Sequence, residues 1–346
     1  MISPNKNILT FYAKKINRNA VIKVIIIVAK KRENFVNLDI VPAILFCLLF
    51  SRPDECDIIN KRIVQGENTM DFNLREKAKE NIIIAAHRGS CGGNIPCNTL
   101  ASYEIALKQG ADMLEVDVSC SADGKLFLFH PFMEHAHLNK PVLLNTLPYS
   151  LVERFRYVNS DNAPTQFGIS SFEDFLEQFK GRCYINIDKF WDNPEKIYKA
   201  IKHHGMTDQM LVKSQLNKKV ITVLKELAPE LPFMPIVRDE HPMHSLLLSE
   251  NINYVGVEVL FKDDSSSVAS EEFIKKMHDD NILVWVNSII YNHKQQLAGG
   301  HSDDTALTES EDIGWGWLAD RGFDVIQTDW VMMLIDYLKR SGRYYK

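Results

Sequence analysis

The sequence lacks the features that would place it in several common protein classes. Its six cysteines form no Cys-x-x-Cys pair and no cysteine–histidine spacing that suits zinc. Its net charge of −5 gives no sign of a nucleic-acid partner. Internal repeats and low-complexity tracts are not evident. Cys91 and Cys97 are close enough in sequence to form a disulfide; the alternative is free thiols in a reducing compartment.

An apolar run long enough to cross a bilayer is also missing. The apolar runs near the N-terminus, residues 24–29 and 40–50, fall short of the ~20 residues that a membrane helix needs. Basic residues at 30–32 precede the second run, as in a signal peptide, but no small-residue cleavage site follows. We therefore expect no stable membrane span and a cytoplasmic protein, or a peripheral or secreted one if this segment is a targeting signal.

The charge that is present is unevenly distributed. Residues 1–32 hold eight Lys or Arg residues and no acid, whereas the remaining residues carry 32 bases against 45 acids. An acidic body suits a protein that binds a metal ion. Residues 1–69 are either a targeting extension or a segment outside the functional protein. We favour the second interpretation, because Met70 opens a short lead-in to the first expected strand. This gives a poorly structured extension at 1–69 and one domain at 70–346.

From residue 82 onward, short apolar runs alternate with helical patterns, which is typical of a parallel sheet covered by helices. The expected strands are 82–87, 113–118, 125–130, 184–189, 210–214, 232–237, 254–259, 282–287 and 325–329. The expected helices are 99–109, 171–180, 194–204, 217–228, 271–280 and 331–340.

The nine apolar runs are one more than an eightfold barrel needs. Only a short segment with Asp123-Gly124 joins the runs 113–118 and 125–130, whereas a parallel crossover needs about a dozen residues or more. The second run is therefore expected to return antiparallel, as a hairpin, which leaves eight parallel strands. We predict an α/β fold, a (β/α)8 TIM barrel with an antiparallel hairpin strand after strand two.

Charged side chains gather at the ends of these strands, where the catalytic groups of a barrel are found. Glu115 and Asp117 lie two apart on one strand and share a face, so burying both is costly unless a cation lies between them. With Asp188 they make three carboxylates, a set that suits Mg²⁺ or Ca²⁺. The other candidates at strand ends are His87, Arg88, His130, Lys213, Glu258 and Asp329.

The two histidines flank these carboxylates in the predicted barrel. His87 and His130 can divide the work of general base and general acid, and Arg88 is placed to contact a phosphate in a bidentate manner. The structural alternatives are hydrogen-bonded core histidines and carboxylates that pair with a neighbouring base.

Two features near the C-terminus have more than one interpretation. Residues 299–312, rich in Gly, Ser and Asp, are expected to form a long mobile loop over the barrel mouth. Trp315 and Trp317 are either aromatics that face a substrate or anchors of this loop.

The order of these motifs resembles the glycerophosphodiester phosphodiesterase family. The matching pieces, in chain order, are His87-Arg88-Gly89, Asn98-Thr99-Leu100, a helix, residues 110–118, Asp123-Gly124 and a strand ending in His130. Residues 322–329 are similar to the closing strand of that family. The combination is specific although no single piece is, and it covers about residues 82–340.

The resemblance implies a TIM-barrel hydrolase that cleaves glycerophosphodiesters to an alcohol and glycerol 3-phosphate with one divalent cation. Carried over by position, the metal ligands would be Glu115, Asp117 and Asp188. His87 would be the general base and His130 the general acid. Arg88 would hold the phosphate of this small-molecule substrate.

The chain departs from the family pattern at three places. Cys97 stands where the family has Glu, and Pro131 stands where it has Asp. The family places a Lys two residues after the acidic ligand of strand three, whereas Lys189 follows Asp188 directly. On a regular strand that shift turns the side chain to the other face, so we name both Lys189 and Lys213 as candidates for phosphate binding.

These departures leave two alternative functions open. The first is a phospholipase that acts on an intact lipid, which predicts exposed apolar residues at the mouth among Phe132, Met133, Phe190 and Trp191. The second is a barrel without activity that binds lipid headgroups. The retention of both histidines and all three carboxylates argues against the second, because a binder does not need a matched acid and base.

Overall fold

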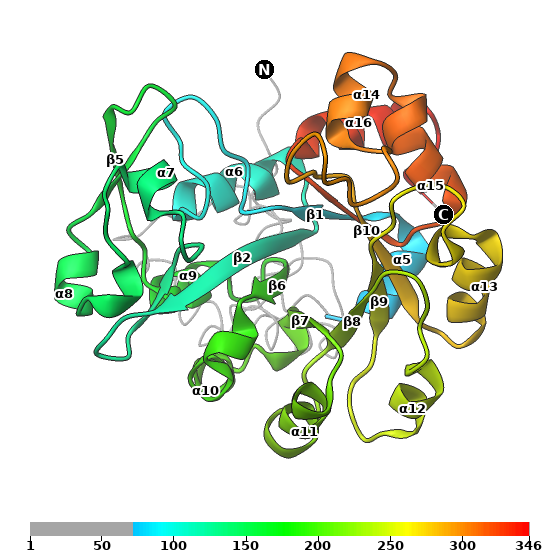
Figure 1. Ribbon diagram of the computed structural model, residues 1–346, viewed down its shortest axis with the longest axis horizontal. Coiled ribbons are helices and arrows are strands. Elements are labelled where there is room, and N and C mark those ends of the chain that lie inside the picture. Colours follow the sequence, from blue (N-terminus) through cyan, green and yellow to red (C-terminus); the bar gives the residue numbers. More distant parts are fainter. Residues whose placement is uncertain (1–71, 346) are drawn as a thin grey trace, which may run out of the picture. The chain divides into compact units, whose positions relative to one another are not determined.

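Residues 72–345 of this chain are described by a computed structural model, and they form a closed parallel barrel surrounded by helices (Figure 1). Eight parallel strands run in the order β1-β11-β10-β9-β8-β7-β6-β2, and β1 pairs with β2 to close the ring. The fold predicted from the alternating pattern is therefore confirmed. The expected extension at residues 1–69 lies outside the described residues.

The elements follow the expected order closely. The barrel strands are β1 (Ile83–Ala86), β2 (Met113–Cys120), β6 (Tyr184–Asp188), β7 (Met210–Gln215), β8 (Phe233–Val237), β9 (Gly256–Val259), β10 (Leu283–Asn287) and β11 (Val325–Thr328). The helices that follow the strands as expected are α6 (Leu100–Gln109), α9 (Phe172–Phe179), α10 (Pro194–His204), α11 (Lys218–Leu227), α13 (Glu271–Asp279) and α16 (Val331–Arg340).

The predicted hairpin is present, and it opens an insertion in the barrel. β3 (Leu126–Leu128) pairs antiparallel with β2, as the Asp123-Gly124 turn indicated. Beyond it, α7 (Glu134–Leu138), α8 (Tyr149–Val152) and the hairpin β4 (Arg156–Val158)–β5 (Pro164–Gly168) lie together at one side of the barrel in Figure 1. They enclose their own apolar cluster, which includes Phe129 and Tyr157. We define residues 131–168 as the insertion.

The barrel interior changes from apolar to polar along the strands. Side chains on the inner face near the strand starts form an apolar cluster, and α5 (Leu74–Glu80) contributes Leu74 and Ala78 to it. A larger cluster lies between the strands and the outer helices. The inner positions nearer the strand ends are polar. The barrel therefore has a packed apolar base at one end and a polar site at the other.

The segment expected to be a mobile loop is partly helical. Residues 299–312 contain α14 (Asp303–Thr308), and the side chain of Ser302 caps the N-terminus of this helix. A five-residue π-helix follows at Asp312–Gly316. Asp303 is buried and accepts hydrogen bonds from Ser288 and Thr328. The expectation of an irregular loop was wrong because Asp303 binds side chains and backbone at the barrel's strand ends, which fixes α14 there. The remaining helices are α12 (His244–Ser249) and α15 (Trp317–Arg321).

Within the described residues, no helix has the length and apolar character needed to span a bilayer. The four cysteines of this part of the chain, Cys91, Cys97, Cys120 and Cys183, are all free. The disulfide considered between Cys91 and Cys97 is therefore not formed.

The turn after β1 depends on a glycine, and we expect Gly89→Ala to destabilise the fold strongly. Gly89 has φ of +79°, and a Cβ there would lie 2.6 Å from Ser102 Oγ and 2.7 Å from its carbonyl carbon. Gly181 has a similar φ of +72° but no atom within 4 Å of the same position. Gly181→Ala should cost about 1–2 kcal/mol for the left-handed backbone alone. Gly89→Ala should cost roughly 3–5 kcal/mol. Thermal unfolding of both variants tests this, and equal losses of stability would contradict it.

Candidate active site

A cavity of about 490 Å³ lies at the polar end of the barrel interior, and the predicted site residues converge on it. Eight residues were given a catalytic, metal-binding or phosphate-binding role from the sequence, and seven of them line it: His87, Arg88, Glu115, His130, Asp188, Lys189 and Lys213. The eighth, Asp117, is fully buried. The rest of the wall is Met133, Asn186, Ile236, Glu258, Asn287, Ile289, Ile290, Tyr291, Leu297 and Gln327.

Glu115 and Asp117 are buried on the inner face of β2, as the period of the strand predicts. Burial, together with the nearby charge of Asp117, raises the pKa of Glu115 to about 7. Asp117 is held by Asn98, whose Nδ2 donates to Asp117 Oδ2 at 2.8 Å. Asp117 Oδ1 is buried and has no hydrogen-bond partner, which leaves one carboxylate oxygen available to a ligand.

Arg88 supplies the positive charge closest to this pair. Its φ of +56° is unusual for a residue other than glycine and turns the chain sharply where β1 ends. In this conformation its backbone N–H donates to Glu115 Oε2 at 2.9 Å. Its Nε lies 2.9 Å from Asp117 Oδ2, as an ion pair and not an aligned hydrogen bond. The strained turn thus directs two groups of one residue at both carboxylates.

The register of the sheet places Asp188 beside Asp117. The two residues are direct partners on the parallel strands β2 and β6. Asp117, Asp188 and His130 each offer a ligand atom, and these atoms lie within 4.8 Å of one another. The sequence predicted Glu115 as the third member of this set, and the geometry instead groups His130 with the two aspartates. Two carboxylates, one of which has an oxygen without a hydrogen-bond partner, and an imidazole are a donor set that fits a divalent cation.

His87 is oriented by Asp329 from the neighbouring strand end. His87 Nδ1 lies 2.9 Å from Asp329 Oδ1, and its backbone N–H donates to the Thr328 carbonyl. Burial acts to lower the pKa of His87, but the hydrogen bond that it donates to Asp329 and the charge of Glu115 raise the pKa above the ordinary value. With Nδ1 held by a carboxylate, the other ring nitrogen is left for proton transfer. The sequence identified Asp329 as a candidate at a strand end but assigned it no chemical role.

His130 is fixed by the chain that follows it. Its Nδ1 lies 2.8 Å from the Pro131 carbonyl oxygen, and because a carbonyl only accepts, this nitrogen carries the proton. The second ring nitrogen is then free to bind or release a proton. Pro131, which replaces an Asp of the family pattern, therefore still orients the histidine through its backbone.

Both candidate lysines contribute to the cavity wall. Lys189 adopts φ of +63°, so the strand ends at Asp188 and the lysine side chain returns to the cavity, where it pairs with that aspartate. Burial acts to raise the pKa of Asp188, but the charge of Lys189 brings it below the ordinary value. Lys213 lies 2.9 Å from Glu258 Oε2 and 3.7 Å above the ring of Trp285. The expectation that Lys189 would face away fails because the backbone leaves the extended conformation there.

Four polar residues of the cavity wall were not identified from the sequence: Asn186, Asn287, Tyr291 and Gln327. Asn186 is the register partner of Glu115, is buried, and has no hydrogen-bond partner for either side-chain polar atom. The signal was available, because Asn186 lies two residues before Asp188 and therefore points the same way. Cys97, by contrast, brings no charge, since burial raises the pKa of its thiol to about 12.

The aromatic residues near the site have mixed roles. Trp315 is fully buried and donates to Asp303, and Trp317 stacks on His301, so both are anchors of the segment and not part of the cavity wall. Phe190 is also fully buried. Phe132, however, is 76% exposed beside the cavity-lining Met133.

Comparisons with known proteins show what this chain is similar to. The matching family model is described as a domain of unknown function and covers residues 233–338. A glycerophosphodiester phosphodiesterase of Bacillus altitudinis is 29% identical over 165 residues, or 45% of this chain and 66% of that protein. A second, from Bacillus subtilis, is 24% identical over 178 residues, or 46% of this chain and 60% of that protein. The chain thus covers less than two thirds of the length of either relative.

Solved structures share the barrel at low sequence identity. A glycerophosphoryl diester phosphodiesterase from Parabacteroides distasonis has a TM-score of 0.64 at 16% identity, over 76% of this chain and 88% of that one. An Oleispira antarctica phosphodiesterase in complex with the product sn-glycerol-3-phosphate has a TM-score of 0.56 at 19% identity, over 75% and 97%. The resemblance carried by the motifs is confirmed: this chain is similar in sequence to proteins named glycerophosphodiester phosphodiesterase and shares the TIM-barrel fold of the solved structures.

Proposed function

We propose that this protein hydrolyses glycerophosphodiesters to an alcohol and glycerol 3-phosphate. The observation that carries the proposal is the convergence on one cavity of two separately oriented histidines, an aspartate pair and three basic side chains. A site that only binds a headgroup does not need two histidines that are each oriented by a hydrogen bond at Nδ1, with the other ring nitrogen left for proton transfer. The names of the relatives in two bacilli support the same reaction class.

We assign the cation site to Asp117 and Asp188, with Glu115 as the third ligand. Glu115 is buried with its pKa raised to about 7, so its charge lacks full compensation, and a bound cation would favour the ionised form. This choice keeps His130 free to act on protons. Mg²⁺ or Ca²⁺ bound there would polarise the phosphoryl oxygen and offset the charge that develops on it.

The two histidines then divide the proton transfers. His87 accepts the proton of the glycerol 2-hydroxyl as that oxygen attacks phosphorus, and Asp329 stabilises the imidazolium that forms. His130 donates a proton to the departing alkoxide, which leaves as the alcohol. The P–O bond formed closes a cyclic phosphate on glycerol. Water then opens it, with His130 as base and His87 as acid, and yields glycerol 3-phosphate.

The basic side chains hold the phosphate during these steps. Arg88 presents a planar guanidinium, and Lys189 and Lys213 add positive charge from the end of β6 and from β7. Each of the three already faces a carboxylate, Arg88 with Asp117, Lys189 with Asp188 and Lys213 with Glu258, so each is held in position before the substrate enters.

His87→Ala should lower kcat for glycerophosphocholine by about 10²–10⁴-fold, because the general base is lost. EDTA should abolish turnover by the wild type, and added Mg²⁺ or Ca²⁺ should restore it. His203→Ala, an exposed histidine on α10, is the matched control and should leave the rate unchanged. Full activity of His87→Ala, or turnover that EDTA does not affect, would contradict the proposal.

Asp329→Asn should lower kcat by about 10–100-fold through loss of the orienting carboxylate. It should also move the acid limb of the pH–rate profile to lower pH. The sign follows because Asp329 raises the pKa of His87, and the neutral imidazole that acts as base then persists to lower pH once the carboxylate is gone. Asp336→Asn on α16 is the control. An acid limb at the wild-type pH would exclude this positioning role.

A second candidate substrate is a diester carried by an intact lipid, and the exposure of Phe132 and Tyr291 beside the cavity favours it. Phe132→Asn removes the ring and suits the positive φ of 68°. We expect it to reduce turnover of lysophosphatidylcholine in vesicles about tenfold, since a buried Phe contributes roughly 1.5–3 kcal/mol. Glycerophosphocholine turnover should stay unchanged. Ile313→Asn, 53% exposed and outside the cavity wall, is the control. Equal effects on both substrates would exclude the lipid route.

A further inference from the structure

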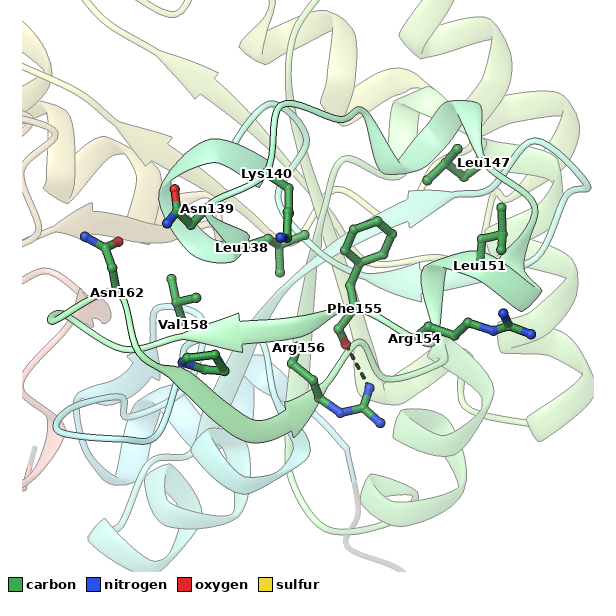
Figure 2. A pocket seen from close by; sticks show the side chains of 11 residues that line it. Leu138, Asn139, Lys140, Leu147, Leu151, Arg154, Phe155, Arg156, Val158 and Asn162 are labelled. Carbon is green, nitrogen blue, oxygen red and sulfur yellow. Dashed lines mark hydrogen bonds between the residues drawn. The ribbon is translucent and has the colours of Figure 1, made fainter.

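A second cavity, of about 540 Å³, lies in the insertion and has no wall residue in common with the active site. Figure 2 shows it between α7, α8 and the β4–β5 hairpin. Its volume lies within the range of small-molecule sites, about 300–1,000 Å³. Nothing in the proposed reaction uses this cavity.

The wall of this cavity is mostly apolar. Leu138 at the end of α7 is buried, Phe155 is half-buried, and Leu151 on α8 is 42% exposed. Leu147, Val158 and Pro164 complete the apolar part. Figure 2 shows the Phe155 ring between the α7 and α8 sides of the cavity. A surface of this kind that faces solvent is suited to an apolar ligand.

The charged residues of the wall are all basic. Lys140, Arg154 and Arg156 line the cavity, and no acidic residue does. Within the described residues none of the three forms an ion pair, whereas other surface arginines do, such as Arg182 with Glu104. Arg156 is held by two backbone carbonyls, those of Glu153 and Phe155. The cavity therefore offers uncompensated positive charge next to an apolar surface.

The acidic residues of the insertion do not supply the missing partner. Glu134 is buried and accepts a hydrogen bond from the Leu144 backbone N–H. Glu153 and Asp161 are exposed and lie outside the cavity wall. Within residues 72–345 no acidic side chain lines this cavity, so its complement is an anion from outside this part of the chain.

We propose that the insertion binds a single-chain anionic amphiphile, a long-chain carboxylate, in this cavity. The carboxylate would contact Lys140, whose side chain lies beside the Phe155 ring in Figure 2, and the hydrocarbon chain would lie along Phe155 and Leu151. An ammonium group pairs with a carboxylate, Arg154 adds positive charge at the far side of the wall, and burying methylene groups against leucine and phenylalanine removes apolar surface from water. This site is independent of the proposed reaction, because the ligand occupies a different cavity.

Calorimetric titration of the full chain with dodecanoate, below its micelle concentration, tests the proposal. We expect one dodecanoate per chain, with hexanoate at least about tenfold weaker because less hydrocarbon is buried. Acetate and dodecyltrimethylammonium should not bind detectably. Binding of acetate as tight as that of dodecanoate would overturn the amphiphile. Binding of dodecyltrimethylammonium as tight as that of dodecanoate would overturn the selectivity for a negative charge. Binding seen only with anionic vesicles would mean that the insertion recognises a membrane surface and not a single amphiphile, which would overturn the proposal.

Variants locate the ligand. The double change Lys140→Glu and Arg154→Glu should weaken dodecanoate binding by about tenfold or more, since both charges are reversed. Lys218→Glu with Lys219→Glu on α11 makes the same change in net charge away from the cavity and should have no effect. Leu151→Asn should weaken dodecanoate more than hexanoate. Unchanged unfolding temperatures establish folding, and wild-type affinity in the Lys140/Arg154 variant would overturn the site. None of these variants alters the active site, so a failure here leaves the proposed hydrolysis untouched.

Discussion

Glu115 and Asp117 are two carboxylates on one face of one strand, removed from water inside the barrel, and their mutual repulsion is the constraint around which the site is arranged. Arg88 contributes its backbone N–H to the first carboxylate and its guanidinium to the second. Asn98 donates to Asp117 from the loop before α6. These contacts reduce the cost of burial without removing it, since the pKa of Glu115 is still raised and one oxygen of Asp117 has no partner. A divalent cation meets both remaining needs.

The same constraint explains why strained backbone gathers around the site. Arg88 and Lys189 both have left-handed backbone conformations at strand ends, and in both the side chain reaches a site carboxylate. Such conformations cost about 1–3 kcal/mol each and persist only where the surroundings fix them. The apolar base of the barrel provides that rigid support. The insertion has its own apolar cluster, so its cavity can take a ligand without disturbing the barrel strands.

Most of the fold and much of the site could be predicted from the sequence, because both depend on period and order along the chain. The alternation of apolar runs predicts the barrel, and the short Asp123-Gly124 connection predicts the hairpin. Strand ends identify His87, Asp188 and Asp329. The features that could not be predicted depend on tertiary contacts. The Lys189 side chain points into the cavity because its φ is positive, which an apolar strand pattern does not indicate. The helix α14 is held by buried hydrogen bonds to Asp303, which lie between segments far apart in the sequence. The insertion has no strong period, so its elements were missed.

Cation binding by the carboxylates of β2 and β6 is the property on which the proposed chemistry depends most directly. Thermal unfolding with Mg²⁺ or Ca²⁺, against EDTA, measures this without an activity assay, because a ligand of the folded state raises its stability. We predict a higher unfolding temperature with the cation for the wild type and for His87→Ala, and no increase for Asp188→Asn. The same increase in Asp188→Asn, or none in the wild type, would contradict the central claim.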